Sequence, residues 1–316
     1  MSFPDQFAGL ENVTLPPRSL HLAIGMFDGV HLGHQAVIEE AVRAARRAGG
    51  LAGVLTFWPH PSALFNPAGR TRMLMSPEMK FRVLRQLGVD VVITQTFSPE
   101  FARITAEEFL PQLQRRLPRL AGVYVGENWR FGAGRRGDVP LLLAEAARRQ
   151  VPVLSIPRVH LHGAPISSTR VRDDLEAGRL EEANLLLGYA YFAVGVVVPG
   201  RRLGRTLGFP TLNVPWQPEL QPRHGVYAVR VGDDQTPPVP GVANYGTRPT
   251  VASAGEPLLE VHVLGPCALS TGSHLTVEWL KFLRPEQKFA SVDELRGQVS
   301  RDRESAEGWF RQPVAK

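Results

Sequence analysis

Cysteine and long apolar runs are scarce in this chain. Its 316 residues include a single cysteine, Cys267, which excludes an intramolecular disulfide and a zinc site built from several cysteines. No stretch approaches the roughly 20 apolar residues of a membrane span, and the N-terminus lacks a basic start followed by an apolar run. With 43% hydrophobic and 21% charged residues, the composition predicts a globular cytoplasmic protein without a membrane partner.

Lysine is also scarce, since only four of the 36 basic residues are lysine. The formal net charge of +6 is spread along the chain, and no basic block is longer than a pair such as Arg46–Arg47. This distribution does not favour nucleic acid as a partner. The favoured interpretation is ordinary solvated arginines. Because guanidinium groups bind phosphate through paired hydrogen bonds, small phosphorylated ligands are the main alternative.

The first part of the chain alternates short apolar runs with amphipathic segments, as in a parallel sheet flanked by helices. The expected strands are Leu20–Phe27, Leu51–Phe57, Val89–Gln95, Gly122–Gly126 and Val151–Ile156. The expected helices are His34–Arg47, Pro77–Leu87, Ala106–Arg116, Val139–Gln150, a segment from Ser167–Thr169 to Gly178, and Leu180–Leu187. The pattern therefore predicts an N-terminal α/β domain.

After Gly188 the hydrophobic pattern changes to period two, with many glycines and prolines, which predicts a small antiparallel β-barrel. Its expected strands are Tyr191–Val198, Gly225–Val231, Val239–Tyr245, Glu260–Leu264 and Thr276–Phe282. Helical spacing returns over Val292–Phe310. The expected domains are thus residues 1–187 and 188–316.

A glycine-rich segment, Gly25–His34, follows the first expected strand and opens the first expected helix. Open α/β sheets bind phosphates at such strand ends, where helix N–H groups and the helix dipole attract anions. His31 and His34 lie three positions apart and can converge on one phosphate; surface histidines or metal ligands are the alternatives. The other candidate phosphate contacts are Gly25, Phe27, Asp28, Gly29 and Gly33.

A second segment, Ile166–Arg172, places hydroxyl groups at an expected helix N-terminus and then two arginines. Serine and threonine are also the commonest helix caps, so simple capping is the alternative. The candidate residues are Ser167, Ser168, Thr169 and Arg172.

Together the two segments resemble the nucleotidyltransferase superfamily. Thr56–Pro61, Val125–Gly132 and Arg135–Asp138 narrow the resemblance to the adenylyltransferase domain of bacterial bifunctional riboflavin kinase/FMN adenylyltransferases. The resemblance implies a Rossmann-like fold in which His31, His34 and Arg172 are catalytic. It also places His60, Asn128 and Arg130 near FMN or adenosine. Many members have Asp-Phe where this chain has Asn128–Trp129.

In the second half, the segment Gly200–Asn213 is rich in glycine and arginine and ends in Pro-Thr-x-Asn, which we expect to be a turn. Thr211 and Asn213 can offer neutral oxygens to Mg²⁺. Phosphoryl transfer to an alcohol also needs a proton acceptor, for which Glu260 is our candidate. By its strand pattern alone, Glu260 is a solvated surface residue.

This half resembles the riboflavin kinase domain of the same family, through the segments Gly225–Tyr227, Gly241–Thr250, Glu260–His262 and Arg284–Phe289. The resemblance implies Thr211 and Asn213 as Mg²⁺ ligands and Glu260 as the catalytic base. The implied contacts with ATP or flavin are Gly200, Arg202, Gly204, Gly208, Pro210, Asn244 and Arg284. Ala268–Gly272 departs from the Asp-Leu-Tyr-Gly of most members.

The resemblance implies an enzyme that converts riboflavin to FMN and FMN to FAD with ATP and Mg²⁺. The alternatives are a nucleotidyltransferase for another metabolite, a flavin sensor without turnover, and a barrel that binds single-stranded nucleic acid. The last is disfavoured because the candidate stacking aromatics of the barrel are scattered singly along the sequence.

Overall fold

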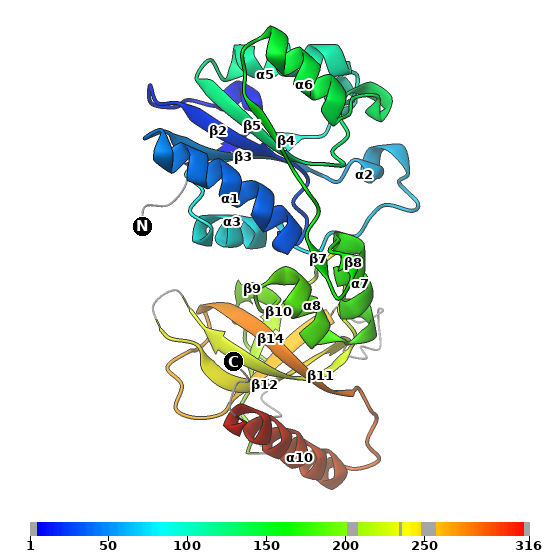
Figure 1. Ribbon diagram of the computed structural model, residues 1–316. Coiled ribbons are helices and arrows are strands. Elements are labelled where there is room, and N and C mark those ends of the chain that lie inside the picture. Colours follow the sequence, from blue (N-terminus) through cyan, green and yellow to red (C-terminus); the bar gives the residue numbers. More distant parts are fainter. Residues whose placement is uncertain (1–4, 201–207, 234–235, 248–256, 313–316) are drawn as a thin grey trace. The chain divides into compact units, whose positions relative to one another are not determined.

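The computed structural model describes residues 5–200, 208–233, 236–247 and 257–312. The chain divides into two compact units, Met1–Ser168 and Thr169–Lys316 (Figure 1). Among the described residues, no helix combines the length and apolar character needed to cross a membrane.

The first unit is built on a six-stranded parallel sheet with the strand order β1-β4-β3-β2-β5-β6. The strands are β1 (Asp5–Ala8), β2 (Leu20–Ile24), β3 (Leu51–Trp58), β4 (Val91–Thr96), β5 (Leu120–Gly126) and β6 (Val153–Ile156). After β2, the next strands β3 and β4 lie on one side of it, and the strands β5 and β6 lie on the other side. The strand order therefore reverses between β4 and β5. Ligands bind in α/β folds at the carboxyl ends of strands where the order reverses in this way.

Helices cover both faces of this sheet, α1 and α3 on one and α5 and α6 on the other (Figure 1). The helices are α1 (Leu32–Arg47), α2 (Ser62–Phe65), α3 (Pro77–Gln86), α4 (Pro99–Ala102), α5 (Ala106–Arg116) and α6 (Val139–Arg148), with short 3₁₀ turns at Leu10–Asn12 and Ala133–Arg135. Double coverage explains why every residue of β2 is buried. A two-stranded hairpin, β7 (His160–Leu161) and β8 (Ala164–Pro165), ends the unit.

Side-chain caps define the starts of several helices. Asp138 accepts a hydrogen bond from the Leu141 N–H at 3.0 Å and thereby caps the N-terminus of α6. Thr105 and Glu108 form a reciprocal capping box at the start of α5.

The second unit begins with two helices, α7 (Ser168–Ala177) and α8 (Leu180–Leu187). Its six-stranded sheet has the order β10-β13-β12-β11-β14-β9. The strands are β9 (Phe192–Val196), β10 (Leu212–Pro215), β11 (Gly225–Gly232), β12 (Val239–Thr247), β13 (Pro257–Val263) and β14 (His274–Pro285), all paired antiparallel. A bridge between Val198 and Asn213 brings the two edges together and nearly closes the barrel.

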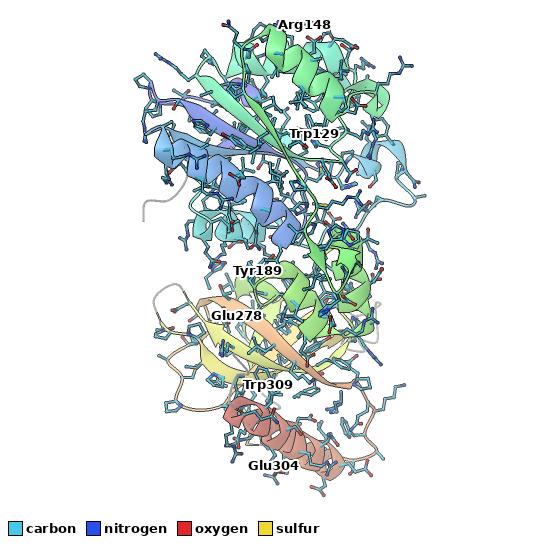
Figure 2. The ribbon with its side chains drawn as sticks, viewed as in Figure 1. Trp129, Arg148, Tyr189, Glu278, Glu304 and Trp309 are labelled. Atoms are coloured by element: carbon cyan, nitrogen blue, oxygen red, sulfur yellow. The ribbon has the colours of Figure 1, made fainter. Side chains whose placement is uncertain are left out.

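The barrel has an aromatic interior and a helix on its outer face. The C-terminal helix α10 (Val292–Arg311) covers the outside of β11 and β12, where Ala306 and Trp309 pack with Val226 and Val242 (Figure 2). On another part of the barrel, α8 is joined to β14 by the Asn184 Nδ2–H, which donates to the Trp279 carbonyl at 2.9 Å.

The predicted fold class is confirmed, and the differences are local. We expected a turn over Pro210–Asn213, and this prediction is wrong for Leu212 and Asn213. Both residues belong to strand β10, which starts at Leu212. Four residues ending in proline carry little strand signal, and long-range pairing decides their conformation. β2 ends at Ile24 rather than Phe27, because Phe27 has a φ of 46° and leaves the sheet.

Trp279 should dominate the stability of the barrel. It is fully buried, with ring centroids 4.5 Å from Tyr227 and 5.4 Å from both Trp216 and Tyr245. We expect Trp279→Ala to lower the free energy of unfolding by about 3–5 kcal/mol, because the cavity left behind cannot collapse fully. Chemical denaturation followed by circular dichroism measures this loss. The exposed Val196 on β9 supplies the control, since Val196→Ala should cost about 0.5 kcal/mol; equal losses in both variants would contradict the assignment.

Candidate functional sites

The loop after β2 carries the first candidate site. Two of its residues with side chains have positive φ, Phe27 at 46° and Val30 at 35°, and Gly29 between them is at 81°. Such a conformation is rare for a β-branched residue and is concentrated at functional sites. Asp28 is buried and helps to hold the loop, since its carboxylate accepts a hydrogen bond from the Leu74 N–H at 2.9 Å.

The two candidate histidines stack on each other at the start of α1. Their ring centroids are 3.6 Å apart, and the Nδ1 of His31 accepts the backbone N–H of His34 at 3.3 Å, which caps the helix. A Cβ on Gly33 would lie 3.2 Å from the His31 ring, so glycine leaves room for this stack. The sequence-based pairing of the two histidines is therefore observed in the structure.

The protonation of the pair follows from its surroundings. Burial lowers the pKa of His34 well below 6.5, and the nearby His31 and Lys80 lower it further, so His34 is neutral at pH 7. The Nδ1 of His34 is buried and has no hydrogen-bond partner among the described residues. We therefore assign its proton to Nε2, because this tautomer leaves no buried N–H group unpaired at Nδ1. Because the Nδ1 of His31 is an acceptor, its proton also lies on Nε2. Both rings can thus offer an Nε2–H donor beside the N-terminus of α1.

The second motif meets this loop through Ser168. Its hydroxyl donates to the Asp28 carbonyl at 2.8 Å, although the two residues are 140 positions apart. Ser167 directly precedes it, whereas Thr169 and Arg172 follow on α7, in the second compact unit.

The residues expected near FMN or adenosine make local contacts. His60 follows the Trp58–Pro59 bond, and its Nδ1 lies 2.8 Å from the Ser62 hydroxyl at the start of α2. Asn128 is exposed, and its amide oxygen faces the Arg158 guanidinium. Arg130 forms a surface ion pair with Asp138 at 3.4 Å. Their binding roles stay predictions.

The second candidate site follows a single row across the barrel sheet. Asn213 of β10 pairs with Glu260 of β13, which pairs on its other side with Asn244 of β12. The row continues through Val226 of β11 to Arg284 of β14. Directly paired residues share a face of the sheet, so residues far apart in the sequence come together on the outside of the barrel.

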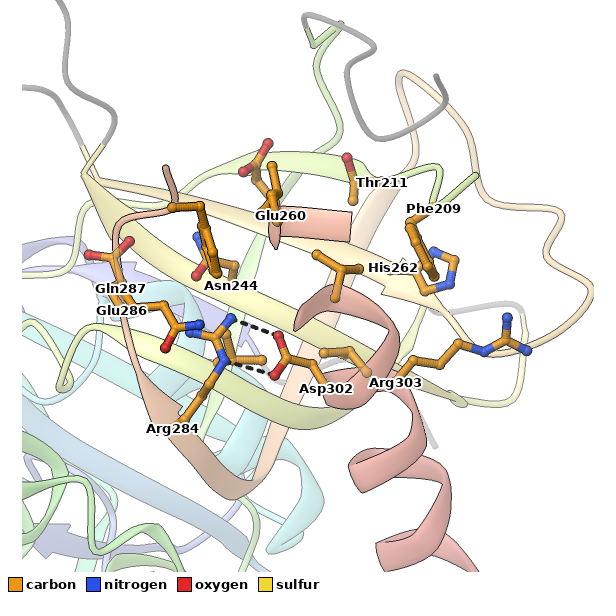
Figure 3. A pocket seen from close by; sticks show the side chains of 15 residues that line it. Phe209, Thr211, Asn244, Glu260, His262, Arg284, Glu286, Gln287, Asp302 and Arg303 are labelled. Atoms are coloured by element: carbon orange, nitrogen blue, oxygen red, sulfur yellow. Dashed lines mark hydrogen bonds and ion pairs between the residues drawn. The ribbon is translucent and has the colours of Figure 1, made fainter. Parts of the chain in front are cut away.

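A cavity of about 270 Å³ lies between this face and α10 (Figure 3). At its polar end, the Glu260 carboxylate and the Thr211 hydroxyl point to the same side of the sheet. The apolar wall includes Val226, Val242, Phe289, Leu295 and Val299. Such a cavity suits a ligand with an apolar part and a polar part.

Asn213 is buried beside Glu260, and its Nδ2–H donates to the Thr211 carbonyl at 3.3 Å. A Cβ on Gly200 would lie 2.3 Å from this amide, so any larger residue there would displace the Asn213 side chain. On the same face, His262 lies 2.9 Å from the Pro210 carbonyl through Nδ1 and fixes the chain just before Thr211. Gly208 has a φ of 88°, and Arg202 and Gly204 lie outside the described residues.

Arg284 ties the sheet to α10 at the edge of the cavity. Its guanidinium donates from Nε and Nη2 to the two carboxylate oxygens of Asp302, each at 2.7 Å (Figure 3). Asp302 is 5% exposed and also accepts from Gln298 at 2.8 Å. The expected contact of Arg284 with ATP or flavin stays a prediction.

Sequence reasoning missed several residues around the sites. His262 was detectable, because it lies two positions from Glu260 and therefore shares its strand face. Asp302 and the buried Lys80 had no such signal, since each is an ordinary charged residue within a helical pattern. The departing segment Ala268–Gly272 forms a loop after β13 whose Gly272 N–H donates to the Val197 carbonyl at 2.9 Å.

Comparison with known proteins covers both units. The chain matches the FAD synthetase family over residues 15–170 and the riboflavin kinase family over residues 187–310. The bifunctional riboflavin kinase/FMN adenylyltransferase of Escherichia coli (strain K12) is 40% identical over 303 residues, which covers 96% of each chain. The enzyme of the same name from Listeria monocytogenes is 34% identical over 292 residues, covering 92% of each.

A crystal structure described as a macrolide-efflux protein from Streptococcus pneumoniae is also similar. Its TM-score is 0.85 at 29% identity, and the match covers 98% of this chain and 100% of that one. Both family matches occur in one chain, and the two bifunctional relatives are at least 34% identical to it over at least 92% of each chain. The chain therefore belongs to the family of bifunctional riboflavin kinase/FMN adenylyltransferases.

Proposed function

We propose that this protein phosphorylates riboflavin with ATP to give FMN, and then adenylates FMN with a second ATP to give FAD and pyrophosphate. The observation that carries this proposal is the row Asn213–Glu260–Asn244 beside an apolar cavity, in the same chain as the stacked histidine pair. We assign adenylyl transfer to the domain 1–187 and riboflavin phosphorylation to the domain 188–316.

In the kinase domain, Glu260 is the base. Its carboxylate accepts the proton of the ribityl 5′-hydroxyl as that oxygen attacks the γ-phosphorus of ATP and ADP leaves. The apolar wall of the cavity takes the flavin ring, with Asn244 at the rim. Gly200, Gly208 and Pro210 belong to the adjoining segment, which binds the nucleotide phosphates.

The residues beside Glu260 fit Mg²⁺. The Thr211 hydroxyl and the Asn213 amide oxygen are the hard, neutral ligands this ion accepts, and no group of three or more His, Cys, Asp or Glu residues within the described chain offers a competing metal site. When bound with ATP, Mg²⁺ neutralises negative charge on the transferring phosphate.

In the adenylyltransferase domain, a phosphate oxygen of FMN attacks the α-phosphorus of ATP, and pyrophosphate leaves. The nucleophile is already ionised, so no general base is needed. His31 and His34 stabilise the crowded α-phosphate through their Nε2–H groups, together with the N-terminus of α1. Ser167, Ser168, Thr169 and Arg172 hold the β- and γ-phosphates. Gly25, Gly29 and Gly33 allow the nucleotide to approach the backbone.

Chromatography of products tests the two activities directly. We expect purified protein to form FMN and FAD from riboflavin, ATP and Mg²⁺, and FAD from supplied FMN. If FAD forms only from supplied FMN, the kinase assignment is wrong, and the loop Ala268–Gly272 becomes the first place to look for the cause. If neither product appears, the proposed function is refuted.

Glu260→Gln should lower riboflavin phosphorylation by roughly 10²–10⁴-fold, because the amide cannot accept the hydroxyl proton. Adenylation of supplied FMN should stay within about twofold, because its site lies on the other domain. Glu304→Gln is the control, since Glu304 is exposed on α10. Product chromatography measures both activities, and loss of both in a folded Glu260→Gln variant would contradict independent sites.

His31→Ala should slow FAD formation by roughly 10²–10³-fold, because it removes a hydrogen-bond donor to the α-phosphate. The substitution also removes the cap of α1, which costs about 1 kcal/mol of stability. Thr105→Ala separates the two effects, since it removes the cap of α5 away from the proposed site. Initial rates with supplied FMN measure the effect. Similar rates in the two variants would remove His31 from the mechanism.

A further inference from the structure

Lys80 is buried beneath the loop after β2 that carries the first candidate site, the candidate phosphate loop. It belongs to α3, is 4% exposed, and is the single lysine of the first unit. Its Nζ donates to the Met26 carbonyl at 2.7 Å and to the Thr56 hydroxyl at 2.9 Å. The Thr56 hydroxyl donates to the same Met26 carbonyl at 2.9 Å. Two donors from different elements therefore hold the carbonyl that precedes the positive-φ residue Phe27.

Keeping a charge in this place is costly. Burial lowers the pKa of Lys80 to about 8, and the carboxylate of Asp28 acts in the opposite direction. The ammonium is therefore mostly protonated at pH 7. A methionine would fill a similar volume without the desolvation cost, so stability alone does not explain a lysine here. Arginine is the commoner basic residue of this chain, but its planar guanidinium is larger than an ammonium. The site offers only two acceptors, the Met26 carbonyl and the Thr56 hydroxyl.

Two ionisable groups of the candidate site interact electrostatically with Lys80, namely Asp28 and His34. Asp28 lies on the loop, and His31 and His34 lie at the start of α1. The positive charge of Lys80 is one of the causes that lower the pKa of His34, and so it helps to keep that ring a neutral donor. The ammonium is thus coupled both to the backbone of the loop and to the protonation of the histidine pair.

We propose that Lys80 is a positioning residue for adenylyl transfer, whose ammonium fixes the Met26 carbonyl and thereby the turn that presents His31 and His34 to the α-phosphate of ATP. This inference rests on the function proposed for the first domain. Lys80 is buried beneath the loop and acts through its hydrogen bond to the Met26 carbonyl.

Lys80→Met is the central variant, with FAD formation from supplied FMN measured between pH 6.5 and 9.5. We expect kcat to fall by about 10–100-fold, because small displacements of a catalytic group cost rates of this order. KM for FMN should change by less than about threefold. The riboflavin kinase activity of the same molecule should be unchanged, because its site lies in the second unit, and circular dichroism reports whether the first unit is folded.

The pH profile separates positioning from simple structural support. A neutral amine is a weaker hydrogen-bond donor to the Met26 carbonyl than the ammonium, so in the wild-type protein kcat should fall as the pH rises through about 8. This descending limb should be missing from Lys80→Met. Thr56→Val keeps the ammonium but loses the second donor, so it should retain the limb with a loss of at most about tenfold. Lys281, which is partly exposed and forms an ion pair with Glu181 in the second unit, supplies the matched control, since Lys281→Met should make FAD from FMN at the wild-type rate.

Three outcomes would overturn the proposal. These are a kcat of Lys80→Met within twofold of the wild type, a descending limb that persists unchanged in that variant, and a flat wild-type profile across pH 8. The last result decides the question even if Lys80→Met does not fold. Failure of the wild-type protein to make FAD from FMN would instead refute the function proposed for the domain.

Discussion

The carbonyl of Met26 is the point on which the first candidate site depends. Strand β2 lies inside a sheet covered on both faces, so the chain must turn sharply to start α1. Phe27 and Val30 turn in conformations that cost of order 1–3 kcal/mol each. The hydrogen bonds that converge on Met26 and Asp28 offset that cost. The direction of α1 and the placement of both imidazoles follow from this turn.

The barrel positions its site by a different means. Cross-strand pairing places Asn213, Glu260 and Asn244 side by side without unusual backbone conformations. Asn213 also forms the bridge to Val198 that brings the two sheet edges together, so the proposed metal ligand and barrel closure share one residue. The Arg284–Asp302 pair then joins α10 to the sheet and shapes the far side of the cavity.

The contrast between the sites matches the chemistry proposed for each. The phosphate of FMN is already an anionic nucleophile, so neutral donors and a helix N-terminus suffice at the first site. The ribityl hydroxyl must lose a proton, and the second site supplies a carboxylate to accept it. The low pKa of His34 fits a group that donates a hydrogen bond and does not need to carry a charge.

The sequence by itself determined the fold class, most helices and strands, and the motifs of both candidate sites. It could do so because hydrophobic periodicity, helix caps and glycine-rich segments are local signals. It did not predict that Asn213 lies in a strand, that Arg284 pairs with Asp302, or that Lys80 is buried under the phosphate loop. Those features depend on contacts between residues up to 54 positions apart. Only the tertiary structure decided them, because a lysine in a helical pattern has the same local signal whether its ammonium ends in water or on a buried carbonyl.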